Sequence, residues 1–161
     1  MLLRPIQESD CAAIVSMVTD NRVNKTYMLP DFDCPEDALP LFRRLAALSL
    51  EEARFVRAIE AEGRCVGFVN DVEITDGSIE LGYVIHPDSW NRGHATAALT
   101  DAIRQLRARG FRQVITGAFQ ENTASIRVME KAGMTRLDKT DEIEYRGKIH
   151  RCVYYAVTKE E

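Results

Sequence analysis

The stretch IELGYVIHPDSWNRGHATAALTDAIRQL, residues 79–106, changes its periodicity in the middle. Its first part is an alternating, largely apolar run of the kind found in strands, and this run stops at Pro87. A turn of small and polar residues follows. From about His94 the apolar residues recur at helical spacing, and Gly110 marks the end of that pattern. The stretch therefore predicts a strand, a tight turn and a helix.

The predicted turn has the composition of a phosphate-binding site. A helix N-terminus exposes unpaired N–H groups and a partial positive charge, and small residues let an anion approach them. Gly93, Ala95 and Ala97 are small, Arg92 adds a cation and Thr96 adds a hydroxyl. The same composition also suits a tight turn before an Ala-rich packed helix. It lacks the Gly-Lys-Ser/Thr ending of a nucleotide triphosphatase loop and the three spaced glycines of a dinucleotide fold.

The rest of the chain predicts an α+β domain with a mixed sheet covered by helices. Three strand-like runs separated by Gly63 and Gly77 predict an antiparallel meander. A helix capped by Ser9 or Asp10 precedes an irregular segment, and Pro40 must lie in the first turn of the next helix. We expect strands near 2–6, 55–61, 65–74, 79–85 and 113–119, helices near 10–18, 35–53, 94–109 and 121–134, and two final strands joined at Arg146-Gly147.

Composition limits the function classes. The chain has 161 residues and a net charge of −4, so we expect one domain, residues 1–161, without the basic surplus of a nucleic-acid binder. No apolar run approaches the roughly 20 residues of a membrane span, so we expect a cytoplasmic protein that binds no membrane. The cysteines and histidines lack metal-ligand spacing, and we expect Cys11, Cys65 and Cys152 in the core.

The predicted turn and the last predicted helix each contain a short motif. The residues Trp90-Asn91-Arg92-Gly93-His94-Ala95 have the form W-x-x-G-x-A. The segment ENTASIRVMEKAGM, residues 121–134, has the form N-x-x-S-x-x-x-x-E-K-x-G-M/F. The first motif resembles the coenzyme A loop of the GNAT superfamily of N-acetyltransferases, in particular its RimJ/RimL-like branch, and the second resembles another motif of that family. The resemblance covers essentially the whole chain, including the final hairpin.

The resemblance implies a GNAT-like, mostly antiparallel sheet of about seven strands flanked by about four helices, with its fourth and fifth strands splayed apart. It also implies acetyl-CoA as cosubstrate, no metal, and transfer of the acetyl group to an amine in a ternary complex. Edge groups of the fourth strand would pair with pantetheine, and the N–H near Val84 or Ile85 would face the thioester oxygen. Contacts with acetyl-CoA are implied at Tyr83, Val84, Ile85, Arg92, Gly93, His94, Ala95, Thr96, Ala97, Asn122 and Ser125.

Two residues are candidates for proton handling. Glu80 lies on the strand beside the implied cofactor site and is our first candidate for the base that neutralises the amine, ahead of Asp71 and Glu73. Many relatives carry a tyrosine acid where this chain has Met129, so Ser125 is the candidate donor to the leaving thiolate. Each has a plainer interpretation. Glu80 would be a solvated strand residue, and the Ser125 hydroxyl would bond its own helix backbone.

The acceptor is the least determined part. The acidic segment PDFDCPED, residues 30–37, would attract a cationic amine, or it would serve as helix capping and a solvated face. Protein N-termini and small-molecule amines both fit the resemblance, which also allows a homodimer. Two other functions stay open, a GNAT-fold module that binds acyl-CoA without catalysis and a nucleotide-binding domain unrelated to coenzyme A.

Overall fold

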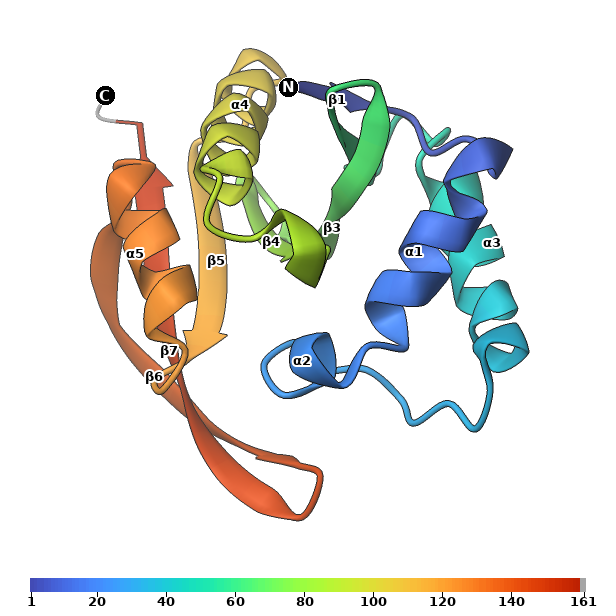
Figure 1. Cartoon of the computed structure of the whole chain (residues 1–161). Helices are drawn as coiled ribbons and strands as arrows, with labels where there is room; N and C mark the ends of the chain where they lie inside the picture. Colours follow the sequence, from blue (N-terminus) through green and yellow to red (C-terminus); the bar gives the residue numbers. More distant parts are fainter. Residues whose placement is uncertain (160–161) are drawn as a thin grey trace.

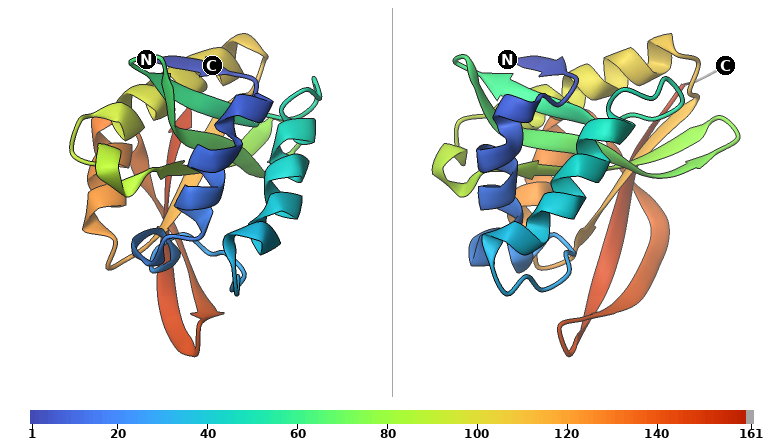
Figure 2. Two further views of the ribbon diagram at one scale, coloured as in Figure 1. Left: turned by 45° about the vertical axis from the view of Figure 1, so that its right-hand side comes forward. Right: turned by 90° about the vertical axis from the view of Figure 1, so that its right-hand side faces the viewer.

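Seven strands form one sheet in the order β1-β2-β3-β4-β5-β7-β6. The computed structural model describes residues 1–159 (Figure 1). The strands are β1 (Leu2–Arg4), β2 (Arg57–Ala61), β3 (Arg64–Thr75), β4 (Ser78–Ile85), β5 (Gln113–Phe119), β6 (Thr135–Tyr145) and β7 (Lys148–Thr158). Neighbouring strands are antiparallel except for β4 and β5, which are parallel. The β6–β7 hairpin projects beyond the other strands (Figure 2).

Helices cover both faces of the sheet. They are α1 (Cys11–Val18), α2 (Asn21–Asn24), α3 (Leu39–Leu48), α4 (His94–Ala108) and α5 (Thr123–Lys131), with short 3-10 turns η1 (Glu8–Asp10), η2 (Pro35–Ala38) and η3 (Pro87–Ser89). Helices α4 and α5 pack on one face, whereas α1 and α3 pack on the other (Figure 1).

Strand β4 contributes to both cores because its side chains alternate between the two faces. Ile79 and Leu81 pack with the buried face of α4, for example with Leu99. Val84 points to the opposite face, where it joins Phe68 and the apolar sides of α1 and α3. The polar side chains of β4 follow the same alternation between the α4 face and the face of α1 and α3.

The predicted α+β fold is confirmed. The meander of β2, β3 and β4, the strand β5 and the final hairpin lie within a few residues of their expected positions. Pro40 is the second residue of α3, as expected for a proline at a helix start. The parallel pairing of β4 with β5 covers only part of both strands, which agrees with the splayed pair that the resemblance implies.

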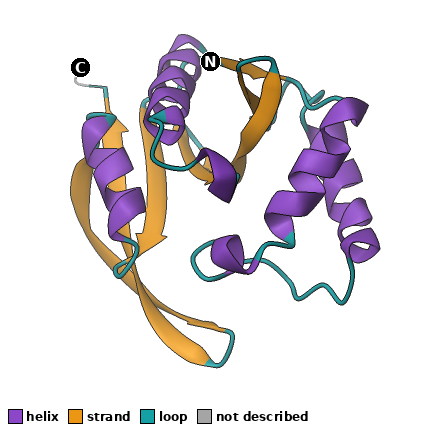
Figure 3. Cartoon of the chain, in the orientation of Figure 1, coloured by secondary structure: helices purple, strands orange, loops and turns teal. Residues whose placement is uncertain are grey.

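Three local expectations differ from the structure. The helix expected near 35–53 is the turn η2 followed by α3, which ends at Leu48. The segment expected to be irregular begins with α2, a single turn whose cap, the Asp20 carboxylate, accepts the Arg22 N–H. Residues 25–34 then form a loop (Figure 3). Asp10 precedes α1 but does not cap it with its side chain. Its carboxylate accepts the Gln7 N–H at 2.8 Å and binds the Arg4 guanidinium instead.

None of the helices within residues 1–159 combines the length and the apolar character that crossing a membrane requires.

Candidate active site

Strands β4 and β5 separate part-way along their length. Their parallel pairing runs from Ser78 opposite Gln113 to Leu81 opposite Thr116. At the last pair the Thr116 hydroxyl donates to the Leu81 carbonyl at 2.9 Å. Beyond this point β4 continues through residues 82–85 and β5 through 117–119, without pairing to each other. We call this separation the split.

The backbone groups that face the split follow from strand alternation. The His86 N–H donates to the Val66 carbonyl at 2.7 Å, so this residue faces β3. In an antiparallel pair alternate residues face the same neighbour, so Val84 also turns its amide toward β3, whereas Tyr83 and Ile85 turn theirs toward the split. The N–H groups of Val84 and Ile85 are the predicted candidates to face the thioester oxygen. Of these two, only the Ile85 N–H points toward the split.

Trp90 fixes the turn that follows β4. Its indole N–H donates to the Ile85 carbonyl at 2.8 Å, which ties the start of the turn to the end of the strand. Asn91 and Gly93 both have left-handed backbone, with φ of 60° and 77°. Gly93 is the N-cap of α4, and a Cβ there would meet no atom within 4 Å. Glycine serves the backbone conformation at this position, and the space in front of the helix is open.

The start of α4 has the features expected of an anion site. The helix is 15 residues long and has no acidic residue in its first turn. The first N–H groups of a helix have no intrahelical partner. Arg92, Gly93 and Ala97 are exposed, while the stretch 94–96 is half-buried. The predicted phosphate-binding residues therefore lie together at an accessible helix N-terminus.

The start of α5 lies across the split. Asn122 is the N-cap of this helix, and its side-chain oxygen accepts the Ser125 N–H at 3.2 Å. That bond uses the side-chain oxygen of Asn122, so its NH2 group is the part of the side chain that could donate to a ligand. The Tyr83 hydroxyl lies 2.6 Å from the Ser125 hydroxyl and donates to the Ser125 carbonyl at 3.2 Å. Met129 is fully buried in the core beneath this turn.

Glu80 lies on the other face of the sheet. Strand alternation puts its side chain on the same face as that of Val84, the face of α1 and α3, whereas Tyr83 packs on the face of α4 and α5. Burial raises the pKa of the Glu80 carboxyl above its ordinary value, the Lys139 ammonium opposes this, and the carboxylates of Glu73 and Asp141 add to it. A carboxyl with a raised pKa holds a proton more readily than an exposed one.

Asp71, a weaker candidate for the base, is occupied by structural bonds. The Arg54 guanidinium contacts its carboxylate at 2.5 Å, and the Phe55 N–H donates to it at 2.7 Å. The side chain is buried. Its role is to hold the segment before β2 against β3, which leaves Glu80 as the better placed carboxylate.

The acidic segment consists of exposed residues. Asp31, Asp33, Glu36 and Asp37 all face solvent, and Asp31 forms an ion pair with Arg146 at 2.8 Å. Glu36 and Asp37 lie in the first turn of η2, where carboxylates favour a helix N-terminus. These contacts support the plainer of the two interpretations of the segment.

Comparison with known proteins decides the family. The family model described as an acetyltransferase (GNAT) domain matches residues 1–135. The chain belongs to the GNAT acetyltransferase family. It is 25% identical over 142 residues to the uncharacterised N-acetyltransferase YoaA of Bacillus subtilis (strain 168), which covers 84% of this chain and 80% of that protein.

Solved structures of GNAT acetyltransferases share the fold. An acetyltransferase (GNAT family) from Bacillus anthracis is 26% identical and superposes with a TM-score of 0.82, over 99% of this chain and 95% of that one. The ribosomal-protein alpha-N-acetyltransferase RimL, solved in complex with coenzyme A, superposes with a TM-score of 0.85 at 19% identity, over 97% of this chain and 92% of that one. The low identity to RimL makes it evidence for the fold alone.

This GNAT acetyltransferase also has polar groups near Glu80 that the sequence did not indicate. The Tyr27 hydroxyl donates to the Asn70 side-chain oxygen at 2.6 Å, and both side chains lie within 3.5 Å of the position that a Cβ on Gly82 would take. The Tyr145 hydroxyl, from the tip of the β6–β7 hairpin, donates to the Asn24 carbonyl at 2.7 Å. No local motif marks these residues, because the contacts join segments far apart in the chain.

The cysteines of this GNAT acetyltransferase differ in exposure. Cys152 is buried, Cys11 and Cys65 are half-buried, and Cys34 is exposed. Within residues 1–159 no group of three or more histidine, cysteine, aspartate or glutamate side chains is arranged to hold a metal ion.

Proposed function

We propose that this acetyltransferase moves an acetyl group from acetyl-CoA to a primary amine by direct attack in a ternary complex. The observation that carries the proposal is the split, which has an open helix N-terminus beside one face of the sheet and a carboxyl with a raised pKa on the other. A donor bound along the split would meet an amine held near Glu80.

The residues around the split fit coenzyme A. The N–H groups of the stretch 93–97 and the Arg92 guanidinium would hold the pyrophosphate, because a Cβ on Gly93 would meet no atom within 4 Å and the helix start is exposed there. The split-facing amides of Tyr83 and Ile85 would pair with the pantetheine arm as an added strand does. The side-chain NH2 group of Asn122 would bond the same arm from the α5 side.

The same residues account for the proton movements. An alkyl ammonium has a pKa near 10.4, so it must lose a proton before its nitrogen can attack the thioester carbon. Glu80 would take this proton directly or through water and release it to solvent. The nitrogen forms the new C–N bond as the C–S bond breaks, and its second proton ends on the sulfur. The Ile85 N–H would stabilise the charge on the thioester oxygen, and the Ser125 hydroxyl would bond the sulfur.

We further propose the RimJ/RimL-like branch, with a peptide N-terminus or a small-molecule amine as the acceptor. Trp90 at the first position of the coenzyme A loop supports this assignment. The acceptor would lie beside Tyr27 and Asn70, whose hydroxyl and amide groups can bond a peptide or an amine ligand.

The test compares two variants of one residue. Gly93→Asn and Gly93→Asp have side chains of similar shape, and both tolerate left-handed backbone at a helix N-cap. The aspartate adds a negative charge where the pyrophosphate would bind. We therefore expect Gly93→Asp to weaken acetyl-CoA binding at least tenfold more than Gly93→Asn does, measured by calorimetry.

Activity is measured as release of free coenzyme A with a panel of peptide and small amines. We expect the wild type to release it only when an acceptor is present, and Gly93→Asp to need more acetyl-CoA for the same rate. Tight acetyl-CoA binding without release for any acceptor would indicate a module that binds acyl-CoA without catalysis. Equal affinities of the two variants would remove the start of α4 from the site.

A further inference from the structure

The contact between Tyr83 and Ser125 bridges the split. Tyr83 belongs to β4 just beyond the last residue that pairs with β5, and Ser125 belongs to the first turn of α5. Their hydroxyl oxygens are 2.6 Å apart, and both side chains are half-buried. Sequence patterns predicted backbone contacts for Tyr83, but its phenol is the group that reaches the proposed donor to the thiolate.

The phenol changes what the serine hydroxyl can do. A helical serine commonly donates to a carbonyl in the preceding turn of its own helix. Here the Ser125 oxygen instead lies at hydrogen-bond distance from the Tyr83 hydroxyl, and the Ser125 carbonyl accepts from the same phenol at 3.2 Å. The serine is therefore held at the split by a group outside its helix.

Two hydroxyl groups supply two hydrogens, and these allow two arrangements. In one, Ser125 donates to Tyr83 and Tyr83 donates to the Ser125 carbonyl, so both hydrogens are used inside the pair. In the other, Tyr83 donates to the Ser125 oxygen, and the Ser125 hydrogen is free to point at a ligand. Negative charge on a sulfur beside Ser125 favours the second arrangement, since an anion attracts the free hydrogen.

Full proton transfer through the pair is unfavourable. Burial raises the pKa of the Tyr83 phenol to about 12, and the hydrogen bond with Ser125 opposes this rise. An aliphatic thiol titrates near 8.5. The phenol is thus the weaker acid by several powers of ten, and a thiolate leaving at the split cannot take its proton at equilibrium. The pair can bond the sulfur, but the proton that ends there comes from the amine.

We propose that Tyr83 is a positioning residue that holds the Ser125 hydroxyl against the leaving sulfur and frees its hydrogen as negative charge develops. This inference rests on the proposed transfer from acetyl-CoA. In place of the tyrosine acid that many relatives carry at the position of Met129, the sulfur is hydrogen-bonded, without proton transfer, by a hydroxyl pair that a different element, β4, completes.

Turnover gives the first test. Tyr83→Phe removes the phenolic hydroxyl and keeps the ring in its packing. We expect kcat to fall roughly two- to tenfold, the range for one lost hydrogen bond, with little change in the KM for acetyl-CoA. Because Tyr83 acts through Ser125, the double variant Tyr83→Phe/Ser125→Ala should be no slower than Ser125→Ala alone. If the two residues acted independently, the fold losses in kcat of the single variants would multiply in the double variant.

Tyr155→Phe is the matched control. The Tyr155 hydroxyl also bonds α5, where it donates to the Glu130 carboxylate at 3.3 Å, but it does not touch Ser125. The same atom is removed from a tyrosine that packs against the same helix. We expect wild-type kcat for this variant. A loss equal to that of Tyr83→Phe would show that any disturbance of α5 slows the enzyme, which would overturn the proposal.

Coenzyme A binding gives a test that needs no turnover. If the pair stabilises a thiolate, coenzyme A should bind more tightly as pH rises through its thiol pKa, about 8.5. Acetyl-CoA has no thiol to titrate, so the ratio of the two affinities removes the pH dependence that both ligands share. We expect the affinity for coenzyme A, divided by the affinity for acetyl-CoA, to rise roughly two- to tenfold between pH 7 and pH 9.5, as measured by calorimetry. This is about the effect of one hydrogen bond.

The outcomes separate the two proposals. Tyr83→Phe and Ser125→Ala should each flatten the pH dependence, whereas Tyr155→Phe should keep it. Thermal unfolding of each variant checks that it is folded, and Ser125→Ala provides a second removal of the same bond. A wild-type protein that binds neither ligand would overturn both proposals. Binding with a pH dependence that Tyr83→Phe leaves unchanged would overturn only the role of Tyr83.

Discussion

At the scale of single residues, Glu80 is the group that we propose as the base for the amine. Its carboxyl is half-buried and its pKa is raised, first by burial, so it can take a proton at higher pH than an exposed glutamate. A base acts only when it is deprotonated. In the wild type, kcat/KM for the acceptor should therefore fall as pH drops through this raised pKa, at a pH above the ordinary value of 4.5.

We predict that Glu80→Gln lowers turnover at neutral pH by about a hundredfold, the lower range for a positioned base. Acetyl-CoA affinity should hardly change, because the groups that we propose to hold acetyl-CoA lie elsewhere. The defect should shrink as pH rises, since more of the acceptor is already neutral. Rates measured from pH 6 to 10 with a verified acceptor test this prediction.

Glu73→Gln is the matched control for Glu80→Gln. Glu73 lies opposite Glu80 in the β3–β4 register and is exposed. Its carboxylate has the same charge and lies near Glu80, so an effect that comes only from removing one negative charge would appear in both variants. Near wild-type activity of Glu80→Gln at pH 7 would assign the proton transfer to water or to another group.

The sequence marks those residues of the proposed site whose environment is local. Gly93 is required by the left-handed backbone before α4, and Asn122 caps α5 within its own turn, so short motifs record both. The phenol of Tyr83 could not be found in this way. Its partner lies in another element, and the spacing between them in the chain carries no periodicity.

At the scale of elements, the β6–β7 hairpin is tied to the loop after α2. The Tyr145 hydroxyl donates to the Asn24 carbonyl at 2.7 Å and accepts the Leu29 N–H at 3.3 Å. The ion pair of Arg146 with Asp31 joins the same two segments. Because the loop also carries Tyr27, the hairpin tip fixes one side of the proposed acceptor region.

We predict that Tyr145→Phe loosens this loop without unfolding the protein. The bonds of the hydroxyl to the Asn24 carbonyl and the Leu29 N–H are both lost, with a combined net effect of about 1–2 kcal/mol on local opening. Hydrogen exchange at residues 24–31 should become roughly five- to thirtyfold faster, and the acceptor KM should rise, while acetyl-CoA affinity is unchanged.

Tyr154→Phe provides the comparison for the hairpin. The Tyr154 hydroxyl donates to the Asp141 carboxylate at 2.8 Å within the hairpin and makes no bond to the loop. Exchange in the loop should stay at the wild-type rate in this variant. Unchanged exchange in Tyr145→Phe as well would mean that the loop is held by its own contacts.

Regular elements were easier to predict than their connections. The strand β5 was predicted at its observed bounds because its apolar run is flanked by clear breaks. The turn α2 was missed because a four-residue helix has too few positions to show a period. The sequence offers Ser9 or Asp10 as a helix cap, but the Asp10 carboxylate binds the Arg4 guanidinium from β1, a partner that no local pattern indicates.

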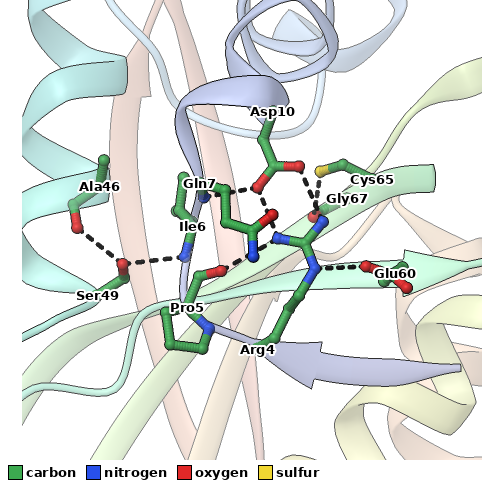
Figure 4. A network of polar contacts seen from close by, with 10 residues as sticks. All are labelled: Arg4, Pro5, Ile6, Gln7, Asp10, Ala46, Ser49, Glu60, Cys65 and Gly67. Atoms are coloured by element: carbon green, nitrogen blue, oxygen red, sulfur yellow. Dashed lines mark hydrogen bonds and ion pairs between the residues drawn. The ribbon is translucent and has the colours of Figure 1, made fainter. Parts of the chain in front are cut away.

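At the scale of the whole molecule, Arg4 connects the first strand to two other elements (Figure 4). Its guanidinium binds the Asp10 carboxylate at 2.7 Å and the Glu60 carboxylate of β2 at 2.5 Å. Burial by itself would raise the pKa of Asp10, but the hydrogen bonds from Arg4 and the Gln7 N–H outweigh it and leave the pKa below 3.8.

We predict that this ion pair contributes to stability at neutral pH and is lost in acid. A carboxyl with a lowered folded-state pKa stabilises the protein above its unfolded pKa, and the contribution disappears as pH falls through the folded value. Asp10→Asn should lower the free energy of unfolding by about 1–3 kcal/mol at pH 7. The difference from wild type should narrow below pH 3.8.

Urea unfolding at pH 7 and at a series of acidic pH values measures this difference. Asp33→Asn makes the same chemical change at an exposed position and should leave the stability unchanged. A gap between Asp10→Asn and wild type that stays constant down to pH 2 would show that the lost stability comes from the shape of the site and not from its charge.

The strand order also bears on how copies of the protein behave when they are crowded together. An unpaired sheet edge can template a strand from another molecule, which is a route to aggregation. One edge here, β1, is only three residues long. The other, β6, is interrupted by an irregularity between Arg136 and Thr140 and carries the exposed carboxylates of Asp141, Glu142 and Glu144. The long hairpin can therefore extend into solvent while its outer strand, through charge repulsion and broken register, discourages the growth of a fibril.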